Sequence, residues 1–356
     1  MNRDRRRVLG FLALPFALDS ASSLLAPLAA ASKKAANRPR AAILAPLSGA
    51  SASIGLSMQR AAMLAQSPQA KAEDLLVLDT GGTAAGATAA VAQALKGAAR
   101  IIIGPLYAGE SRAAARAAGA VPVLSLSNDE DLIGSGAFLL GITATQSVTA
   151  VLGYARSRGV RRLAVLGGSS RWAQQGSAAA ARMNDTAGLN IRQLPENTGP
   201  ANLISALRKA GGGELPDALL VTEGGDALRA IARATATSGL QLLGTQQSLE
   251  LRAEDISGTW LSGPDPAALS ELADRYRSGG ASNPGIIAAL ANDAMTIVEA
   301  LRNGGVVDRS ALFASQGFQG ITGPIRFAAD GSAIREMPVL VAGANGYIRT
   351  DRISAQ

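Results

Sequence analysis

The chain has 356 residues, of which 47% are hydrophobic and only 3% aromatic, a formal net charge of +7, and no histidine or cysteine. Histidine is the only side chain whose unperturbed pKa lies near neutral pH, and cysteine is the readiest nucleophile, so their absence argues against an enzyme and excludes disulfides. The arginines are dispersed and lack stacked aromatic partners, which argues against a nucleic-acid-binding face. The composition favours a binding protein with a sizeable core, in two domains or one large one.

Residues 1–31 have the pattern of an export signal. Arg3, Arg5, Arg6 and Arg7 form a basic start, an apolar stretch runs from Val8 to Leu18, and Ala29-Ala30-Ala31 offers small residues for cleavage. The segment Arg5–Leu9 resembles a twin-arginine signal. The apolar stretch is too short to span a bilayer, and no later segment is long and apolar enough to do so. We expect a protein free in the periplasm, with residues 32–40 as a linker; an uncleaved basic amphipathic anchor is the alternative.

From residue 41 onwards, short apolar segments alternate with segments of helical periodicity. Strands are predicted at 41–49, 74–82, 99–109 and 120–129, and helices at 53–67, 83–98 and 110–118. The alternation then repeats, with helices at 148–159, 172–188, 201–211 and 227–239 and strands at 161–170, 189–196, 216–225 and 240–246. Nearly continuous apolar strands between helices are typical of parallel sheets covered on both faces.

The last third of the chain changes this pattern. Residues 259–266 read as a connector, and helices are predicted at 267–278, 284–305 and 310–317. A pair of strands follows, with Asp330-Gly331 as the turn signal. The predicted fold class is α/β, with two Rossmann-like lobes that contain parallel sheets and are joined by a hinge.

Four segments resemble landmarks of the type I periplasmic binding proteins. They are ILAPLSGASASIG (43–55), IIIGPLYAGESRAAA (101–115), VPVLSLSNDEDL (121–132) and, the most specific, FQGITGPIRFAADGSA (318–333). The resemblance implies a first lobe of residues 41–145, completed by 264–303, and a second lobe of residues 146–263, completed by 304–356. It also implies closure of the two lobes around a bound molecule.

Two branches of that family fit these segments. The resemblance to the Leu/Ile/Val-binding group implies delivery of a small solute to a membrane permease for ABC-type uptake. The resemblance to the penicillin-binding protein activators implies regulation of a cell-wall synthase by protein contacts. The amino-acid binders carry hydroxyl residues where this chain has Ala108 and Asp129, and a Tyr-Gly pair where it has Trp172-Ala173. Asp129 would repel a ligand carboxylate, so these departures put amino-acid binding in doubt.

Ligands of open parallel sheets bind at the carboxyl ends of the strands. Six candidate ligand-binding residues follow predicted strands in this way: Ser48, Tyr107, Ser127, Asn128, Trp172 and Glu223. The two aromatic residues are candidates for stacking, and Glu223 for binding an ammonium group. The alternatives are a turn or N-cap role for Ser48, N-capping by the residues from Ser127 to Asp129, and a solvated loop charge for Glu223.

Cofactor and catalytic motifs are missing from the sequence. Gly211-Gly212-Gly213 is not followed by Lys-Ser/Thr, and the glycines of LGGSSRWAQQG (166–176) do not form a dinucleotide fingerprint. No Gly-x-Ser-x-Gly elbow is present, and a Ser-His-Asp triad cannot form without histidine. The only dense acidic patch, 128–131, reads as a solvated face. The sequence therefore predicts a non-enzymatic binding protein without cofactor or metal, whose partner is a small solute or a protein.

Overall fold

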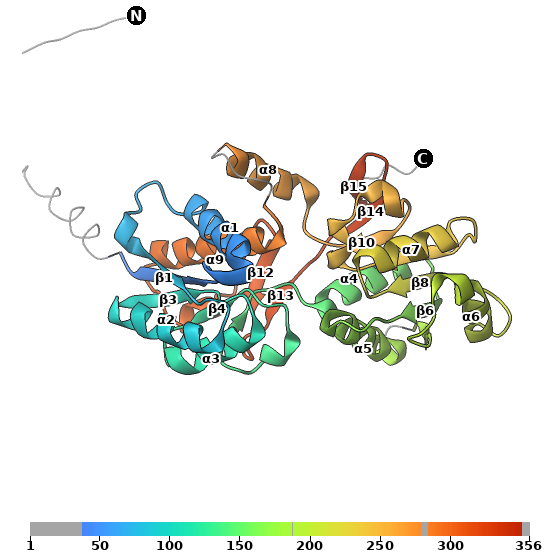
Figure 1. Ribbon diagram of the computed structural model, residues 1–356, viewed down its shortest axis with the longest axis horizontal. Coiled ribbons are helices and arrows are strands. Elements are labelled where there is room, and N and C mark those ends of the chain that lie inside the picture. The colour runs from blue at the N-terminus through green and yellow to red at the C-terminus, as the bar shows by residue number, and fades with distance from the viewer. Residues whose placement is uncertain (1–37, 187, 279–283, 351–356) are drawn as a thin grey trace, which may run out of the picture. The chain divides into compact units, whose positions relative to one another are not determined.

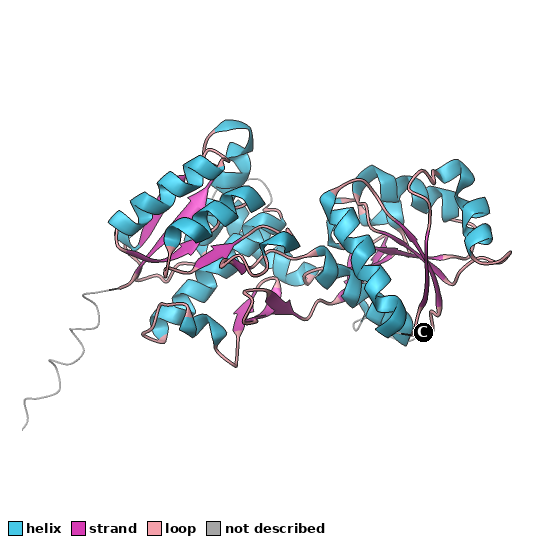
Figure 2. Ribbon diagram, turned by 90° about the horizontal axis from the view of Figure 1, so that it is seen from below, coloured by secondary structure: helices cyan, strands magenta, loops and turns pink. Residues whose placement is uncertain are grey.

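The computed structural model describes residues 38–186, 188–278 and 284–350, so the predicted export signal and most of the predicted linker lie outside the described residues. The described chain contains two mainly parallel sheets, each with helices on both faces (Figures 1 and 2). The predicted α/β class with two Rossmann-like lobes is therefore confirmed. A small third sheet of antiparallel strands belongs to the last third of the chain.

The first sheet has the strand order β2-β1-β3-β4-β5, all parallel. Its strands are β1 (Arg40–Ala45), β2 (Leu75–Asp79), β3 (Ala99–Ile103), β4 (Val123–Ser125) and β5 (Phe138–Leu139). Its helices are α1 (Ala52–Leu64), α2 (Ala84–Lys96) and α3 (Ala108–Ala118), together with α8 (Pro266–Arg277) and α9 (Ile286–Asn303) from the last third of the chain.

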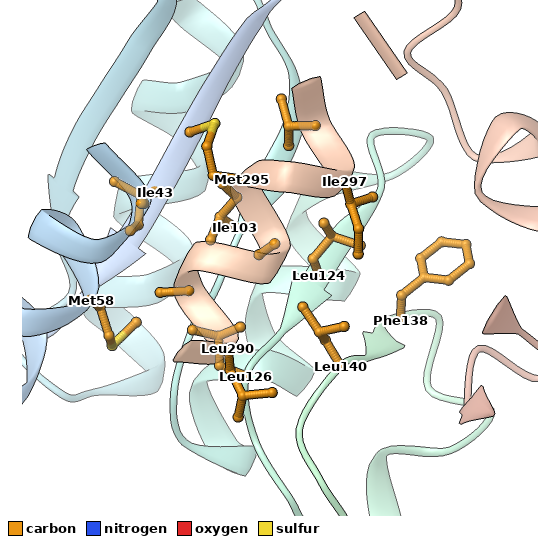
Figure 3. Close-up of a cluster of buried hydrophobic side chains, with 14 of the residues drawn as sticks. Ile43, Met58, Ile103, Leu124, Leu126, Phe138, Leu140, Leu290, Met295 and Ile297 are labelled. Atoms are coloured by element: carbon orange, nitrogen blue, oxygen red, sulfur yellow. The ribbon is translucent and has the colours of Figure 1, made fainter. Parts of the chain in front are cut away.

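The two helical layers that cover β1 explain why its residues 41–45 are all apolar. Ala41, Ile43 and Ala45 belong to the core shared with α1 and α9, whereas Ala42 and Leu44 belong to the core shared with α2 and α3. All five are fully buried, because successive side chains point to opposite faces and a helical layer covers each face. Figure 3 shows the first of these cores, with Leu290, Met295 and Ile297 of α9 among side chains of the sheet.

The second sheet has the order β15-β14-β10-β9-β8-β6-β7. Its parallel strands are β6 (Arg162–Leu166), β7 (Asn190–Gln193), β8 (Ala218–Val221), β9 (Gln241–Gly244) and β10 (Trp260–Ser262), and β14 (Val339–Gly343) and β15 (Gly346–Arg349) pair antiparallel. Its helices are α4 (Ala144–Ser157), α5 (Arg171–Thr186), α6 (Leu203–Ala210) and α7 (Gly225–Thr235). The prediction of a connector at 259–266 was wrong in part, because Trp260–Ser262 forms β10, which pairs with β9 and with β14.

The third sheet consists of β11 (Phe318–Gly320), β12 (Gly323–Phe327) and β13 (Ala333–Arg335). The predicted turn at Asp330-Gly331 is confirmed, since it joins β12 to β13 and Asp330 Oδ1 accepts the Ser332 N–H at 2.9 Å. Where a single pair of strands was predicted, the structure has five: β11 adds to the hairpin of β12 and β13, and Gly343 and Gly346 close a second hairpin between β14 and β15.

Residues after 304 are divided differently from the predicted lobe boundaries. Phe318, Ile325, Phe327 and Ala333 lie in the core of the first sheet, and only β14 and β15 join the second. The reason is aromatic packing against the edge strand β5, where the ring of Phe138 lies 5.5 Å from that of Phe313 and 5.1 Å from that of Phe327. The short helix predicted at 310–317 is a 3₁₀ turn, Ser310–Phe313, which brings Phe313 to this contact.

Three backbone segments connect the lobes, at 140–143, 263–265 and 336–338. Hydrogen bonds tie these segments together. The Gly263 N–H donates to Pro338 O at 3.2 Å, and the Arg335 guanidinium donates to Leu140 O. Two of the connecting segments therefore bond each other directly, and the third is bonded to β13, which directly precedes residues 336–338.

Candidate functional site

Ser48 lies at the carboxyl edge of the first sheet, directly after β1. Its side chain is exposed and bonds Asp79, the last residue of β2. Asp79 Oδ1 also accepts the N–H groups of Leu47 and Gly81, each at 2.8 Å. The hydroxyl of Ser48, followed by these N–H groups, holds the pKa of Asp79 below its usual value. Ser48 makes no side-chain cap bond to the 3₁₀ turn Gly49–Ser51, so its observed partner is a carboxylate and not a helix terminus.

Tyr107 lies beside Ser48 at the same edge, between β3 and α3. Its hydroxyl hydrogen-bonds Ser51 Oγ at 2.6 Å, and its side chain remains 39% exposed. The Tyr107 N–H donates to Glu110 Oε2 at 3.1 Å, which fixes the start of α3. An exposed ring with an anchored hydroxyl is a stacking surface that needs little reorganisation to bind. Ala108, the first residue of α3, contributes no polar group there.

The residues from Ser127 to Asp129 follow β4 at this edge. Two of them bond within the loop, and one is exposed. Ser127 is buried, and its Oγ accepts the Asp129 N–H at 3.2 Å. Asp129 Oδ1 accepts the Asp131 N–H at 3.1 Å and so caps the 3₁₀ turn Glu130–Leu132, which confirms the N-capping alternative for Asp129. Asn128 is exposed, so it is the one member of the triplet that presents its side chain outwards.

The two candidates of the second lobe are both bonded within that lobe. Trp172, on the first turn of α5, is 5% exposed, and its Nε1 donates to Thr245 Oγ1 at 3.1 Å. Glu223, after β8, is half-buried, and its Oε2 accepts the Ser170 N–H at 3.1 Å. In this structure Trp172 is a core residue and offers no exposed face for stacking. Glu223 fixes the loop between β6 and α5.

The structure places Ser48 and Tyr107 after the neighbouring strands β1 and β3, and it adds residues that the sequence did not mark. Asp79 is one of them, and its signal was a polar residue that ends the apolar strand LLVLD before two glycines. Arg171 and Gln175 on α5 are others, because Gln175 Nε2 donates to Asp129 Oδ1 at 2.9 Å. No local pattern marks such partners, since 46 residues separate Asp129 from Gln175 along the chain.

Two cavities lie away from all six predicted residues. One, of about 680 Å³, is lined by the end of α1, by α8 and α9, and by residues 319–321; the other, of about 480 Å³, lies between Asp265, residues 320–324 and residues 336–338. Across residues 38–186, 188–278 and 284–350, no three acidic side chains are grouped to hold a metal ion. The same part of the chain has no helix with the length and apolar character that crossing a membrane requires.

Several solved structures share the fold of this chain. A protein assigned to a branched-chain amino acid ABC transporter of Rhodospirillum rubrum is 19% identical, with a TM-score of 0.74 over 87% of this chain and 99% of that one. The leucine binding protein LivK of Thermotoga maritima is 19% identical, with a TM-score of 0.59 over 88% and 100%. The C-domain of LpoA from Haemophilus influenzae, a regulator of PBP1A, is 18% identical, with a TM-score of 0.65 over 87% and 99%. No curated protein sequence matches significantly.

The family assignment rests on a sequence model as well as on the fold. The model of the periplasmic binding protein family matches residues 39–346, which is most of the described chain. Its span begins before β1 and ends at the first residue of β15, so it includes most of both lobes and all three connecting segments. This chain therefore belongs to the periplasmic binding protein family, with the type I arrangement of two lobes.

Proposed function

We propose that this chain is an exported, non-enzymatic binding protein whose two lobes close around a small solute, for ABC-type uptake through a membrane permease. The observation that carries the proposal is the pair Tyr107 and Ser48 at the carboxyl edge of the first sheet. Tyr107 presents an exposed ring whose hydroxyl is held by Ser51, and Ser48 is exposed beside it. Carboxyl edges of parallel strands are where open α/β folds bind ligands.

The remaining candidates fit this proposal in lesser roles. Asn128 is exposed at the end of the neighbouring strand and is available to bind a polar group of the solute. Ser127, Trp172 and Glu223 already have internal partners, so they support the edges that face the solute. The signal-like segment 1–31, with its twin-arginine pattern, supports delivery to the periplasm.

Ligand-induced stabilisation tests the proposal directly. The exported protein is melted with amino acids, small peptides and muropeptides; a true solute at a hundredfold excess over its Kd adds about 2.7 kcal/mol to the free energy of unfolding. Tyr107→Ala should abolish the thermal shift. Tyr107→Phe keeps the ring and removes the hydroxyl, so it shows which of the two groups contributes to the shift. Ile348→Ala, at a residue that is also 39% exposed but lies on β15, is the matched control and retains the shift.

A second candidate function is regulation of a cell-wall synthase through protein contacts. The observation that favours it is Asp129, whose carboxylate already receives Gln175 Nε2 and lies 3.9 Å from Arg171 Nε, while Ala108 offers no hydroxyl. Neither position therefore offers a side-chain donor to a solute carboxylate. Absence of any thermal shift, together with capture of a penicillin-binding protein from membranes, would replace the uptake proposal with this one.

A further inference from the structure

The acidic turn that follows β4 contacts the second lobe at two helices. We use the name acidic turn for Asp129, Glu130 and Asp131, which the sequence presents as a plain cluster of charges. All three carboxylates bond residues of α4 or α5, and all three residues belong to the first lobe by their position between β4 and β5. The turn is therefore an element of contact between the lobes.

Glu130 binds the start of α4. Its Oε1 accepts the Thr145 N–H at 2.7 Å, and its Oε2 accepts the Thr145 hydroxyl at 2.8 Å. The same hydroxyl accepts Arg182 Nη2 of α5 at 3.0 Å, so Glu130, Thr145 and Arg182 form a chain of bonds. A carboxylate that accepts a free N–H in the first turn of a helix is favoured by hydrogen bonding and by the helix dipole.

Asp129 and Asp131 bind side chains in the first two turns of α5. Gln175 Nε2 donates to Asp129 Oδ1 at 2.9 Å, and Arg171 pairs with Asp131 and lies 3.9 Å from Asp129. Helix α3 holds the backbone of the acidic turn, since Arg112 Nη2 donates to Asp131 O at 3.3 Å. Charge-assisted bonds of this kind are stronger than neutral ones, and here they join α3 and the acidic turn of one lobe to α5 of the other.

We infer that the acidic turn is a built-in latch between the lobes: Glu130 occupies the start of α4, and Asp129 and Asp131 hold side chains of α5. The inference concerns regulation of the proposed site and holds for either proposed function. Its consequence is that an anionic solute reaches the start of α4 only when Glu130 has released it. Opening of the lobes is then controlled by charge, and the exposed Arg171–Asp131 pair makes it sensitive to salt.

The absence of cysteine allows a direct measurement on the exported protein. Leu95→Cys on α2 and Ser205→Cys on α6 place one exposed label on each lobe, and distances between spin labels are measured without ligand. We expect the double change Asp129→Asn with Asp131→Asn, and separately Glu130→Gln, to raise the population of longer distances roughly fivefold or more. About 1 M salt should do the same to the parent and much less to the double variant.

The matched control is Asp274→Asn, which removes an exposed carboxylate that pairs within α8 only and should leave the distances unchanged. Unchanged helix content and melting transitions in each variant establish that the lobes remain folded. Equal distance distributions in the parent, the double variant and Glu130→Gln, at low and high salt, would overturn the inference. Because no solute enters the measurement, failure of the solute-binding proposal leaves this result unaffected.

Discussion

Asp293 on α9 binds both polar groups of Thr322: its Oδ2 accepts the Thr322 N–H at 3.0 Å and the Thr322 hydroxyl at 2.5 Å. Arg335 of β13 donates to the same hydroxyl and to Leu140 O in a crossing segment. Burial raises the pKa of Asp293, and burial lowers the pKa of Arg335 to about 10 despite the opposing charge of Asp293. A buried charged network therefore connects α9 and the third sheet to the hinge.

Removing one member of this network should be costly. Asp293→Ala leaves Arg335 buried without its counter-charge, and we expect a loss of about 3–5 kcal/mol in the free energy of unfolding. Urea denaturation measures the loss. Asp274→Ala, which breaks an exposed pair with Arg277, is the control and should cost less than about 1 kcal/mol. Similar losses in the two variants would show that the network contributes little to stability.

Two glycine substitutions should act in opposite directions. A Cβ on Gly141, in a crossing segment, would lie 1.9 Å from Ser127 O, so the backbone after β4 must move in Gly141→Ala. We expect a loss of about 1–3 kcal/mol from this overpacking. Gly153 lies in the exposed face of α4 with no atom within 4 Å of its Cβ position, so Gly153→Ala should gain about 0.5–1 kcal/mol. Chemical denaturation compares the two, and a neutral Gly141→Ala would contradict the close approach.

Tryptophan fluorescence should distinguish the two tryptophans of the chain. Trp172 is 5% exposed, whereas Trp260 is half-buried against Tyr154, at 5.0 Å between ring centroids. In Trp260→Phe the remaining Trp172 should be quenched by acrylamide much less than Trp260 is in Trp172→Phe. Strong quenching of Trp172 would show that its ring is exposed and available for stacking. Trp172→Phe should also cost about 1–3 kcal/mol, because Thr245 Oγ1 loses its donor.

Stability at high pH should depend on Tyr347. Its hydroxyl donates to Leu251 O at 2.7 Å, and burial, followed by the charge of Asp255, raises its pKa to about 12. An unfolded tyrosine ionises near pH 10, so the unfolded state releases a proton first and the fold loses stability as the pH rises from 10 towards 12. Tyr347→Phe should show a smaller decline over this interval in denaturation experiments. Equal declines would indicate that Tyr347 ionises as it does in water.

Much of the fold was predictable because the signals are local. The strand 41–49 and the helix 53–67 were predicted from apolar periodicity, and they correspond to β1 and α1. The strand Trp260–Ser262 and the edge strand Phe138–Leu139 escaped, because segments of three and two residues carry no period and exist only through their pairing partners. The candidate site follows the same division. Tyr107 was identified at a strand end, but Ser51 and Asp79 became visible only when their contacts with Tyr107 and Ser48 were known.

By itself, the sequence determined the class of protein: without histidine or cysteine it has few groups for catalysis, and its alternating strands and helices specify two parallel sheets. The tertiary structure alone decided what each polar residue does. Trp172 follows a strand, as a ligand-stacking residue would, yet Thr245 and the core enclose it. The acidic turn has the composition of a solvated face, yet it bonds α4 and α5. The physical reason is that a charge or an aromatic ring takes its role from partners distant in sequence, whereas periodicity reports only which face of an element is buried.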